Sequence, residues 1–234
     1  MTGRAAAVPE AGRLQSPARK VVGPLLRGLW SAKVDGLEHV PTSGPALIAP
    51  NHISFIDSIF VLALMPRRTL AVGKAEYMDS WKTRYLFPAI GMIPLDRSGG
   101  SSSDAALAQA AASLQQGDLF LIYPEGTRSR DGFLHRGRTG VARLALRTGA
   151  PIVPVGIRGT DAIQPPGAVV PRPFKPCSLA FGPPIRTEKH DGQEVTRALL
   201  RDLTDEVMYE IGQLSGQTYR DTYGNEQPEL QKQE

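Results

Sequence analysis

The sequence is poor in cysteine and has no long apolar segment. Cys177 is the only cysteine among the 234 residues, so an intrachain disulfide and a cysteine-based zinc cluster are excluded. The longest uninterrupted apolar run, residues 59–65, has seven residues, whereas a membrane-spanning helix needs about 20. The N-terminus also lacks the apolar stretch of a signal peptide. These absences predict a protein of a reducing, cytoplasmic compartment without a membrane-spanning helix.

Patterns typical of metal sites and of nucleic-acid-binding domains are also missing. The four histidines are scattered without the spacing of metal ligands: His39, His52, His135 and His190. Aromatic residues make up 6% of the chain, and no RNA-binding or helix-turn-helix pattern is present. We therefore expect no bound metal and no nucleic-acid partner.

The composition is that of one globular domain with a basic patch. Hydrophobic residues make up 41% of the chain and charged residues 21%, which suits a packed core and argues against global disorder. The net charge is +4, and residues 124–147 alone carry six arginines against two acidic residues. Such a patch indicates an anionic partner, such as a phosphate or an anionic lipid.

Composition also divides the chain into three parts. Residues 1–19 are small, polar and basic and are expected to be disordered. Residues 20–214 carry the patterns of one domain, and residues 215–234 form a polar tail that is expected to be frayed or extended. The proline-rich stretch 164–176 is predicted to be a loop, because too little chain follows it for a second domain.

Short apolar runs alternate with helical patterns through the middle of the chain. Strands are expected at residues 46–49, 69–72, 92–95, 119–123, 152–157 and 178–181. Helices are expected at residues 55–65, 103–115, 137–148 and 194–214. This alternation predicts an α/β fold, a single-domain α/β sandwich with a largely parallel or mixed sheet. In such sheets, sites collect at the carboxyl ends of the strands.

A further, N-terminal helix is expected at residues 21–34, with Pro24 suited to a first helical position. The residues that could form its apolar face are Val22, Leu25, Leu26, Leu29 and Trp30. With basic residues around it, such a face suits an anchor in a membrane interface. It suits equally a helix that packs on the protein's own core, and the sequence leaves both interpretations open.

His52 and Asp57 follow the strand expected at residues 46–49. Five residues advance a continuous helix by about 500°, so the two side chains can meet only if His52 lies in the loop and Asp57 in the first helical turn. One interpretation is structural, with Ser54 as the helix cap and Asp57 as its capping acid. The other is catalytic: Asp57 holds one imidazole nitrogen and leaves the second free to take a proton.

A glycine-containing turn follows the strand expected at residues 119–123. It reads Pro124-Glu125-Gly126-Thr127-Arg128-Ser129. Close backbone approach, a hydroxyl and a guanidinium fork suit a bound phosphate, although a surface turn with a solvated arginine is the alternative. Lys74 and Arg97 follow two further expected strands and bring cations to the same edge of the sheet.

Together these residues resemble the glycerolipid acyltransferases, and most of all the 1-acyl-sn-glycerol-3-phosphate (lysophosphatidate) acyltransferases. The resemblance rests on Asn51-His52-(four residues)-Asp57, on Asp96-Arg97, on Pro124-Glu125-Gly126-Thr127-Arg128-Ser129, on Val153-Pro154-Val155 and on the lead-in at residues 34–41. It covers about residues 20–214 and implies a glycerol-3-phosphate acyltransferase-like fold.

The resemblance implies transfer of a fatty acyl group from acyl-CoA or acyl-carrier protein to 1-acyl-sn-glycerol 3-phosphate, giving phosphatidic acid in phospholipid biosynthesis. It implies His52 as the catalytic base and Asp57 as its partner. The residues that it implies for acceptor binding are Lys74, Arg97, Glu125, Gly126, Thr127 and Arg128. It implies no metal and no cofactor beyond the acyl donor. Many members have Phe where this chain has Tyr123, which is a mild departure.

The resemblance also implies contact with a phospholipid membrane surface. Some members carry longer hydrophobic N-termini, so we expect attachment here to be peripheral, at the inner face of the cell membrane, and weaker or differently built. Tyr77, Trp81 and Tyr85 recur at helical spacing and are candidates for the rim of an acyl-chain groove, with core packing as the alternative. The oligomeric state is left open.

Two other functions fit the same residues. One is a hydrolase, or an acyltransferase for another acceptor, with the same base; the other acceptors are glycerol 3-phosphate itself, a lysophospholipid or a glycolipid. The other is a non-catalytic lipid-binding protein, which the presence of both His52 and Asp57 disfavours. Direct transfer without an acyl-enzyme is expected, because no Gly-x-Ser-x-Gly elbow is present and Cys177 lies far in sequence from both motifs.

Overall fold

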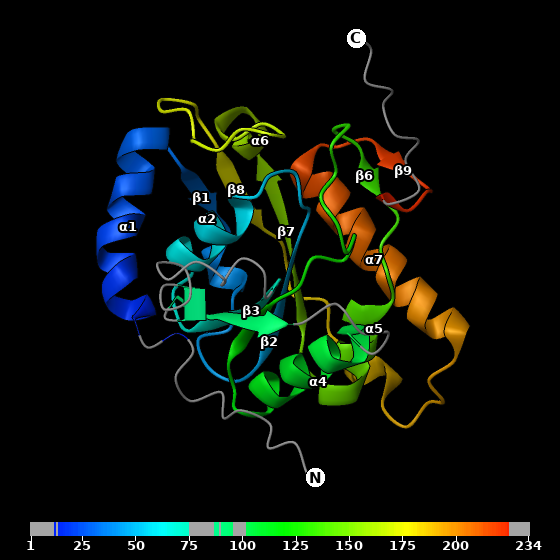
Figure 1. Cartoon of the computed structure of the whole chain (residues 1–234). Coiled ribbons are helices and arrows are strands. Elements are labelled where there is room, and N and C mark those ends of the chain that lie inside the picture. Colours follow the sequence, from blue (N-terminus) through cyan, green and yellow to red (C-terminus); the bar gives the residue numbers. More distant parts are fainter. Residues whose placement is uncertain (1–11, 13, 75–86, 89, 96–101, 225–234) are drawn as a thin grey trace.

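A seven-stranded sheet forms the centre of the protein (Figure 1). The computed structural model describes residues 12, 14–74, 87–88, 90–95 and 102–224. The strands of this sheet are β1 (Lys33–Asp35), β2 (Ala46–Pro50), β3 (Thr69–Lys74), β4 (Met92–Leu95), β5 (Leu119–Leu121), β7 (Ile152–Arg158) and β8 (Ser178–Phe181). Their order is β1-β8-β7-β2-β5-β3-β4, and every neighbouring pair is parallel except β7 and β8.

Helices cover both faces of the sheet (Figure 1). The helices are α1 (Gln15–Trp30), α2 (Asp57–Leu64), α4 (Ser102–Gln115), α5 (Gly140–Thr148), α6 (Thr160–Ile163) and α7 (Arg197–Ser215), with short 3-10 turns at Leu37–His39 and Glu188–His190. Strand β2 shows why two layers form: Ala46 and Ile48 pack in the core with α1 and α2, whereas Leu47 and Ala49 pack with α4, α5 and α7. The predicted α/β sandwich is confirmed.

The expected strands and helices are present, with changed ends. The additions are the short helix α6, the two 3-10 turns and three strands: β1, β6 (Leu134–His135) and β9 (Tyr219–Arg220), the last two forming a small second sheet. Each of these strands is only two or three residues long and is held by pairing with a distant segment, which a local pattern does not reveal.

Helix α1 begins earlier than its sequence pattern predicts. Residues 15–19, expected to be disordered, are helical, Pro24 lies inside the helix, and Val34 belongs to β1. A tertiary contact accounts for the early start: the buried Gln15 side chain accepts a hydrogen bond from the backbone N–H of Thr69 and donates one to the carbonyl of Ile90. Tertiary contacts of this kind override local propensity.

Of the two open interpretations of the N-terminal helix, packing on the protein's own core is confirmed and the membrane anchor stays a prediction. Leu26 is buried, and Val22 and Trp30 pack against the core beside α2. Val21 and Leu25 point outward and are 71% and 55% exposed. None of the helices in the described part of the chain is long and apolar enough to cross a membrane.

Residues 216–224 were expected to belong to a frayed or extended tail, but they pair with an earlier segment of the chain. Gly216 ends the helix with a left-handed φ of 69°. The backbone N–H of Leu134 then donates to Thr218, and that of Arg136 donates to Thr222. Polar composition predicted a frayed or extended segment, but backbone pairing with residues 134–136 fixes it.

Candidate active site

The carboxyl ends of β2, β5 and β7 lie at one edge of the sheet and carry the polar motifs. His52 lies in the loop between β2 and α2, and Asp57 is the first residue of α2. Nδ1 of His52 lies 2.9 Å from Oδ2 of Asp57. The sequence argument required this division between loop and helix, and the structure shows it.

Asp57 is completely buried, yet its carboxylate is fully hydrogen-bonded. Oδ2 also accepts from the backbone N–H groups of Ile53 and Ser54, each at 2.8 Å, and Oδ1 accepts from the hydroxyl of Thr160. An acceptor-only carboxylate beside Nδ1 requires that Nδ1 carries the hydrogen in the neutral ring. Nε2 is then the nitrogen with a lone pair, as a general base requires.

The structural interpretation of this motif is half right. Asp57 reaches back to the backbone N–H of Ser54, as a capping acid does. Ser54 does not cap the helix with its own side chain, because its hydroxyl donates to the carbonyl of Gln164 at 2.8 Å. One carboxylate therefore both caps the turn and orients the imidazole.

Tyr123 fixes the plane of the His52 ring. The two rings are stacked, with centroids 3.8 Å apart and an interplanar angle of 17°. The hydroxyl of Tyr123 lies 2.8 Å from that of Ser58. Burial, with the nearby Asp57 carboxylate, raises the pKa of Tyr123 well above its usual value, so the phenol stays neutral beside the histidine. Phe at this position would keep the stack and lose only the hydrogen bond.

Glu125 is buried and hydrogen-bonded inside the protein, and its predicted role in acceptor binding stays a prediction. It is 1% exposed, and its two oxygens accept from the backbone N–H groups of His52 and His135, each at 3.0 Å. Burial raises the pKa of Glu125 to about 7, although the two N–H donors favour the charged form. Glu125 is thus a positioning residue that ties the His52 loop to β6.

Sequence reasoning gave no separate role to Asn51, which fastens the same loop to β7. Its side chain is buried and bonds both backbone groups of Ile157, donating to the carbonyl at 2.9 Å and accepting from the N–H at 2.7 Å. It also donates to the side chain of Gln217, from the segment after α7. An amide placed beside the histidine at a strand end was the only signal in the sequence. Thr160 and Gln217 carried none.

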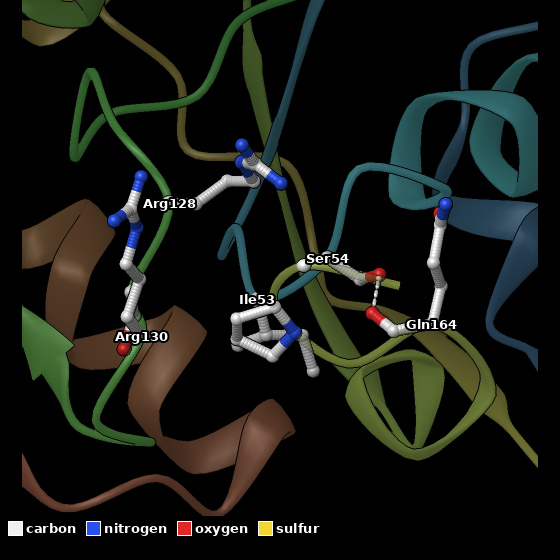
Figure 2. Close-up of a pocket in the computed structure, with 8 residues that line it drawn as sticks. Ile53, Ser54, Arg128, Arg130 and Gln164 are labelled. Carbon is white, nitrogen blue, oxygen red and sulfur yellow. Dashed lines mark hydrogen bonds between the residues drawn. The ribbon is translucent and has the colours of Figure 1, made fainter. Parts of the chain in front are cut away.

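Arg128 faces a hollow beside the histidine loop (Figure 2). The hollow has a volume of about 260 Å³ and is lined by Ile53, Ser54, Arg128, Ser129, Arg130, Gln164, Pro166 and Gly167. Figure 2 shows Arg128 and Arg130 on one side of it and Ser54 and Gln164 on the other. Arg128 makes no hydrogen bond or ion pair with the residues described. His52 does not line the hollow, which begins at its neighbours Ile53 and Ser54.

Gly126 makes the turn that presents this arginine. Its φ of 72° lies in the left-handed region, and a Cβ there would come within 3.0 Å of the Arg138 side chain. Thr127 follows it and is half-buried. A second hollow of about 460 Å³ shares Ile53, Ser129, Arg130 and Pro166 with the first and extends to Arg158 and Gln217.

Some predicted residues lie outside the described part of the structure. Lys74 ends β3, but its side chain is not described. Arg97 and the proposed rim residues Tyr77, Trp81 and Tyr85 fall in ranges outside the description. No group of His, Cys, Asp and Glu side chains within the described ranges could hold a metal ion. Cys177 is buried, and burial raises the pKa of its thiol to about 11.

Comparisons with known proteins find similarity to acyltransferases. Residues 31–158, which include both polar motifs, match the family model described as Acyltransferase. A 1-acyl-sn-glycerol-3-phosphate acyltransferase of Limnanthes douglasii is 36% identical over 157 residues, covering 67% of this chain and 55% of that protein. A chloroplastic enzyme of the same description from Arabidopsis thaliana is 31% identical over 172 residues, covering 66% of this chain and 46% of that protein.

A solved structure is similar as well. The 1-acyl-sn-glycerophosphate (LPA) acyltransferase PlsC of Thermotoga maritima superposes with a TM-score of 0.67 and 25% identity, covering 86% of this chain and 79% of that one. The chain spans about half the length of the curated relatives it matches.

Proposed function

The chain belongs to the acyltransferase family, and from this premise we propose that it transfers a fatty acyl group from an acyl thioester to a hydroxyl of 1-acyl-sn-glycerol 3-phosphate, forming phosphatidic acid. The observation that carries the proposal is the pair of His52 Nδ1 and Asp57 Oδ2, 2.9 Å apart. The relatives described as 1-acyl-sn-glycerol-3-phosphate acyltransferases support this choice of acceptor.

The chemical step is a direct transfer. Nε2 of His52 takes the proton of the acceptor hydroxyl while its oxygen attacks the thioester carbonyl, forming a C–O bond. The carbon–sulfur bond then breaks, and the thiolate leaves with little need of an acid, since a thiol has a pKa of about 8.5. The buried carboxylate of Asp57 stabilises the imidazolium, which afterwards returns its proton to the thiolate.

The protein positions the hydroxyl of the acceptor by binding the acceptor's phosphate. Arg128 is the described side chain best suited to hold it, because it faces the hollow beside Ile53 and Ser54 without an internal partner among the described residues. Thr127 and the Gly126 turn assist it. Lys74, the last residue of β3, and Arg97, two positions after β4 in the sequence, are proposed as further cations. Binding of the phosphate orients the acceptor hydroxyl for its attack on the thioester carbonyl.

Acyl-CoA or acyl-carrier protein is the proposed donor, and the inner face of the cell membrane is the proposed location. Burying about 14 methylenes at ~0.8 kcal/mol each is worth roughly 11 kcal/mol, so an acyl chain needs an apolar surface or the bilayer. The exposed Val21 and Leu25 of α1 and the basic residues around them suit peripheral attachment.

Mass spectrometry of products from the purified protein tests the proposal. The protein is given defined acyl-CoA and acyl-carrier-protein donors with a panel of acceptors: 1-acyl-sn-glycerol 3-phosphate, glycerol 3-phosphate, a lysophospholipid without a terminal phosphate, and a glycolipid. Phosphatidic acid as the fastest product is expected. Faster acylation of another acceptor would reassign the substrate, and hydrolysis of the donor alone would contradict transfer.

A further inference from the structure

Exposed apolar side chains gather on the proline-rich loop, residues 164–176, which connects α6 to β8. Val169, Val170 and Phe174 are 88%, 75% and 79% exposed. Among the large apolar side chains of the described residues, these are the three most exposed. A cluster of this kind on a protein surface marks a contact with another apolar phase or molecule.

The loop is held in place by its own hydrogen bonds. The backbone N–H of Arg172 donates to the carbonyl of Ile163 at 2.8 Å, and the Gln164 side chain donates to that of Ala168 at 3.1 Å. Phe174 has a φ of 58°, a left-handed conformation that is unfavourable for an aromatic residue. The fold therefore maintains Phe174 outside in a strained backbone.

The same loop is joined to the end of α1. Nε1 of Trp30 donates to the carbonyl of Arg172 at 2.7 Å, and the backbone N–H of Phe174 donates to the carbonyl of Leu29 at 3.1 Å. Figure 1 shows the loop, in yellow, beside the C-terminal end of α1. The exposed Val21 and Leu25 precede this junction on the helix, so two elements far apart in sequence contribute to one apolar surface.

The two segments that form this surface carry mostly positive charge. Residues 14–35 and 164–176 carry six basic residues, Arg19, Lys20, Arg27, Lys33, Arg172 and Lys175, against the single acidic residue Asp35. Apolar side chains surrounded by cations match a bilayer with anionic headgroups, where the apolar groups enter the acyl region and the cations meet phosphates.

The loop also forms one wall of the hollow that Arg128 faces. Gln164, Pro166 and Gly167 of the loop line that hollow (Figure 2). Gly167 precedes the exposed Val170 by only three residues. A lipid whose acyl chains stay in the bilayer could therefore bring its headgroup to Arg128 past the inserted loop, without leaving the membrane entirely.

We propose that the proline-rich loop, through Val169, Val170 and Phe174, inserts together with the outer side of α1 into an anionic bilayer, so that the lipid acceptor enters the hollow from the membrane. The entry route rests on the proposed function. Insertion of the loop does not, because it concerns binding to vesicles whether or not any lipid is acylated.

The test compares two double variants with matched changes. Val170→Ser with Phe174→Ser alters the loop. Val195→Ser with Tyr209→Ser removes one valine and one aromatic from exposed positions before and within α7, on the other face of the sheet. Binding of the full chain to vesicles of phosphatidylglycerol and phosphatidylcholine is measured by flotation. We expect at least tenfold weaker binding for the loop variant and unchanged binding for the control.

Measurements of acylation rate distinguish a loss of membrane insertion from a loss of catalysis. The loop variant is expected to acylate a short-chain acceptor, used as monomers below its micellar concentration, at the wild-type rate and to lose at least tenfold with acceptor embedded in vesicles. Equal vesicle binding by both variants and wild type would overturn the proposal. So would a wild-type dimer that the loop variant abolishes without change in vesicle binding, since the surface would then join two copies. If no acceptor is acylated, the flotation result still decides insertion.

Discussion

The carboxylate of Glu125 accepts a hydrogen bond from the backbone N–H of His52 at 3.0 Å, and its other oxygen accepts from the backbone N–H of His135. A residue of the loop after β5 therefore sets the position of a histidine in the loop after β2 through its backbone. Because Asp57 and Tyr123 fix the ring itself, backbone and side chain of His52 are held separately.

Glu125→Gln should change how stability depends on pH. The folded-state pKa of Glu125 is about 7, above its usual value of 4.5, because burial disfavours the charge. The stabilising contribution is therefore full below pH 4.5 and is lost as pH rises through 7. The free energy of unfolding of wild type, relative to the variant, should fall by up to about 3 kcal/mol from pH 4 to pH 8. Urea titrations measure it. A pH-independent difference would contradict the burial argument.

Asp57→Asn should reduce turnover less than loss of the base itself. An amide can still accept from some of the backbone donors that Asp57 serves, but it cannot stabilise an imidazolium by charge. General-base catalysis is typically worth about 10²–10⁴ in rate, and this variant should lose part of that. Rates are compared at equal folded protein, checked by circular dichroism. A loss as large as that of His52→Ala would contradict the supporting role given to Asp57.

Arg128→Ala should weaken use of the acceptor about tenfold or more, because a charge-assisted hydrogen bond to phosphate is worth about 1.5–3 kcal/mol. Separate titrations of acceptor and donor give the two KM values. Arg147→Ala, which removes an exposed arginine of α5 away from both hollows, is the matched control. A rise in the donor KM alone would move Arg128 to the donor site.

Patterns in the sequence were sufficient for most of the sheet. The six expected strands are buried in the core, and their apolar runs are long enough to be recognised without tertiary information. The early start of α1 depends on Gln15 bonding Thr69 and Ile90, and β9 depends on pairing with β6. Contacts between segments so far apart leave no local pattern.

The candidate site also contains features that follow from a local sequence pattern and features that depend on contacts between distant segments. The spacing of His52 and Asp57 allowed a contact that depends on one local turn, and that turn is present. The role of Glu125 could not be predicted from spacing, because its partners are backbone N–H groups, which any residue at positions 52 and 135 would supply. Its place shortly after a buried strand was the only hint that the carboxylate is buried.

Cys177→Ser should leave turnover within about twofold of wild type. The thiol is buried, and with a pKa of about 11 it is almost entirely protonated near neutral pH. Donor and acceptor must then both be bound before transfer, so initial-rate plots at several fixed acceptor concentrations should intersect. Parallel lines, together with an acyl-protein adduct trapped by acid quench, would show a two-step mechanism instead.

The most direct test of the account is the rate of phosphatidic acid formation by His52→Ala, measured with a defined acyl-CoA and 1-acyl-sn-glycerol 3-phosphate. The folded variant should lose about 10²–10⁴ in turnover, with little change in the acceptor KM, because the phosphate is held by Arg128 and not by the base. Turnover near that of wild type in a folded His52→Ala protein would contradict the assignment of His52 as the base.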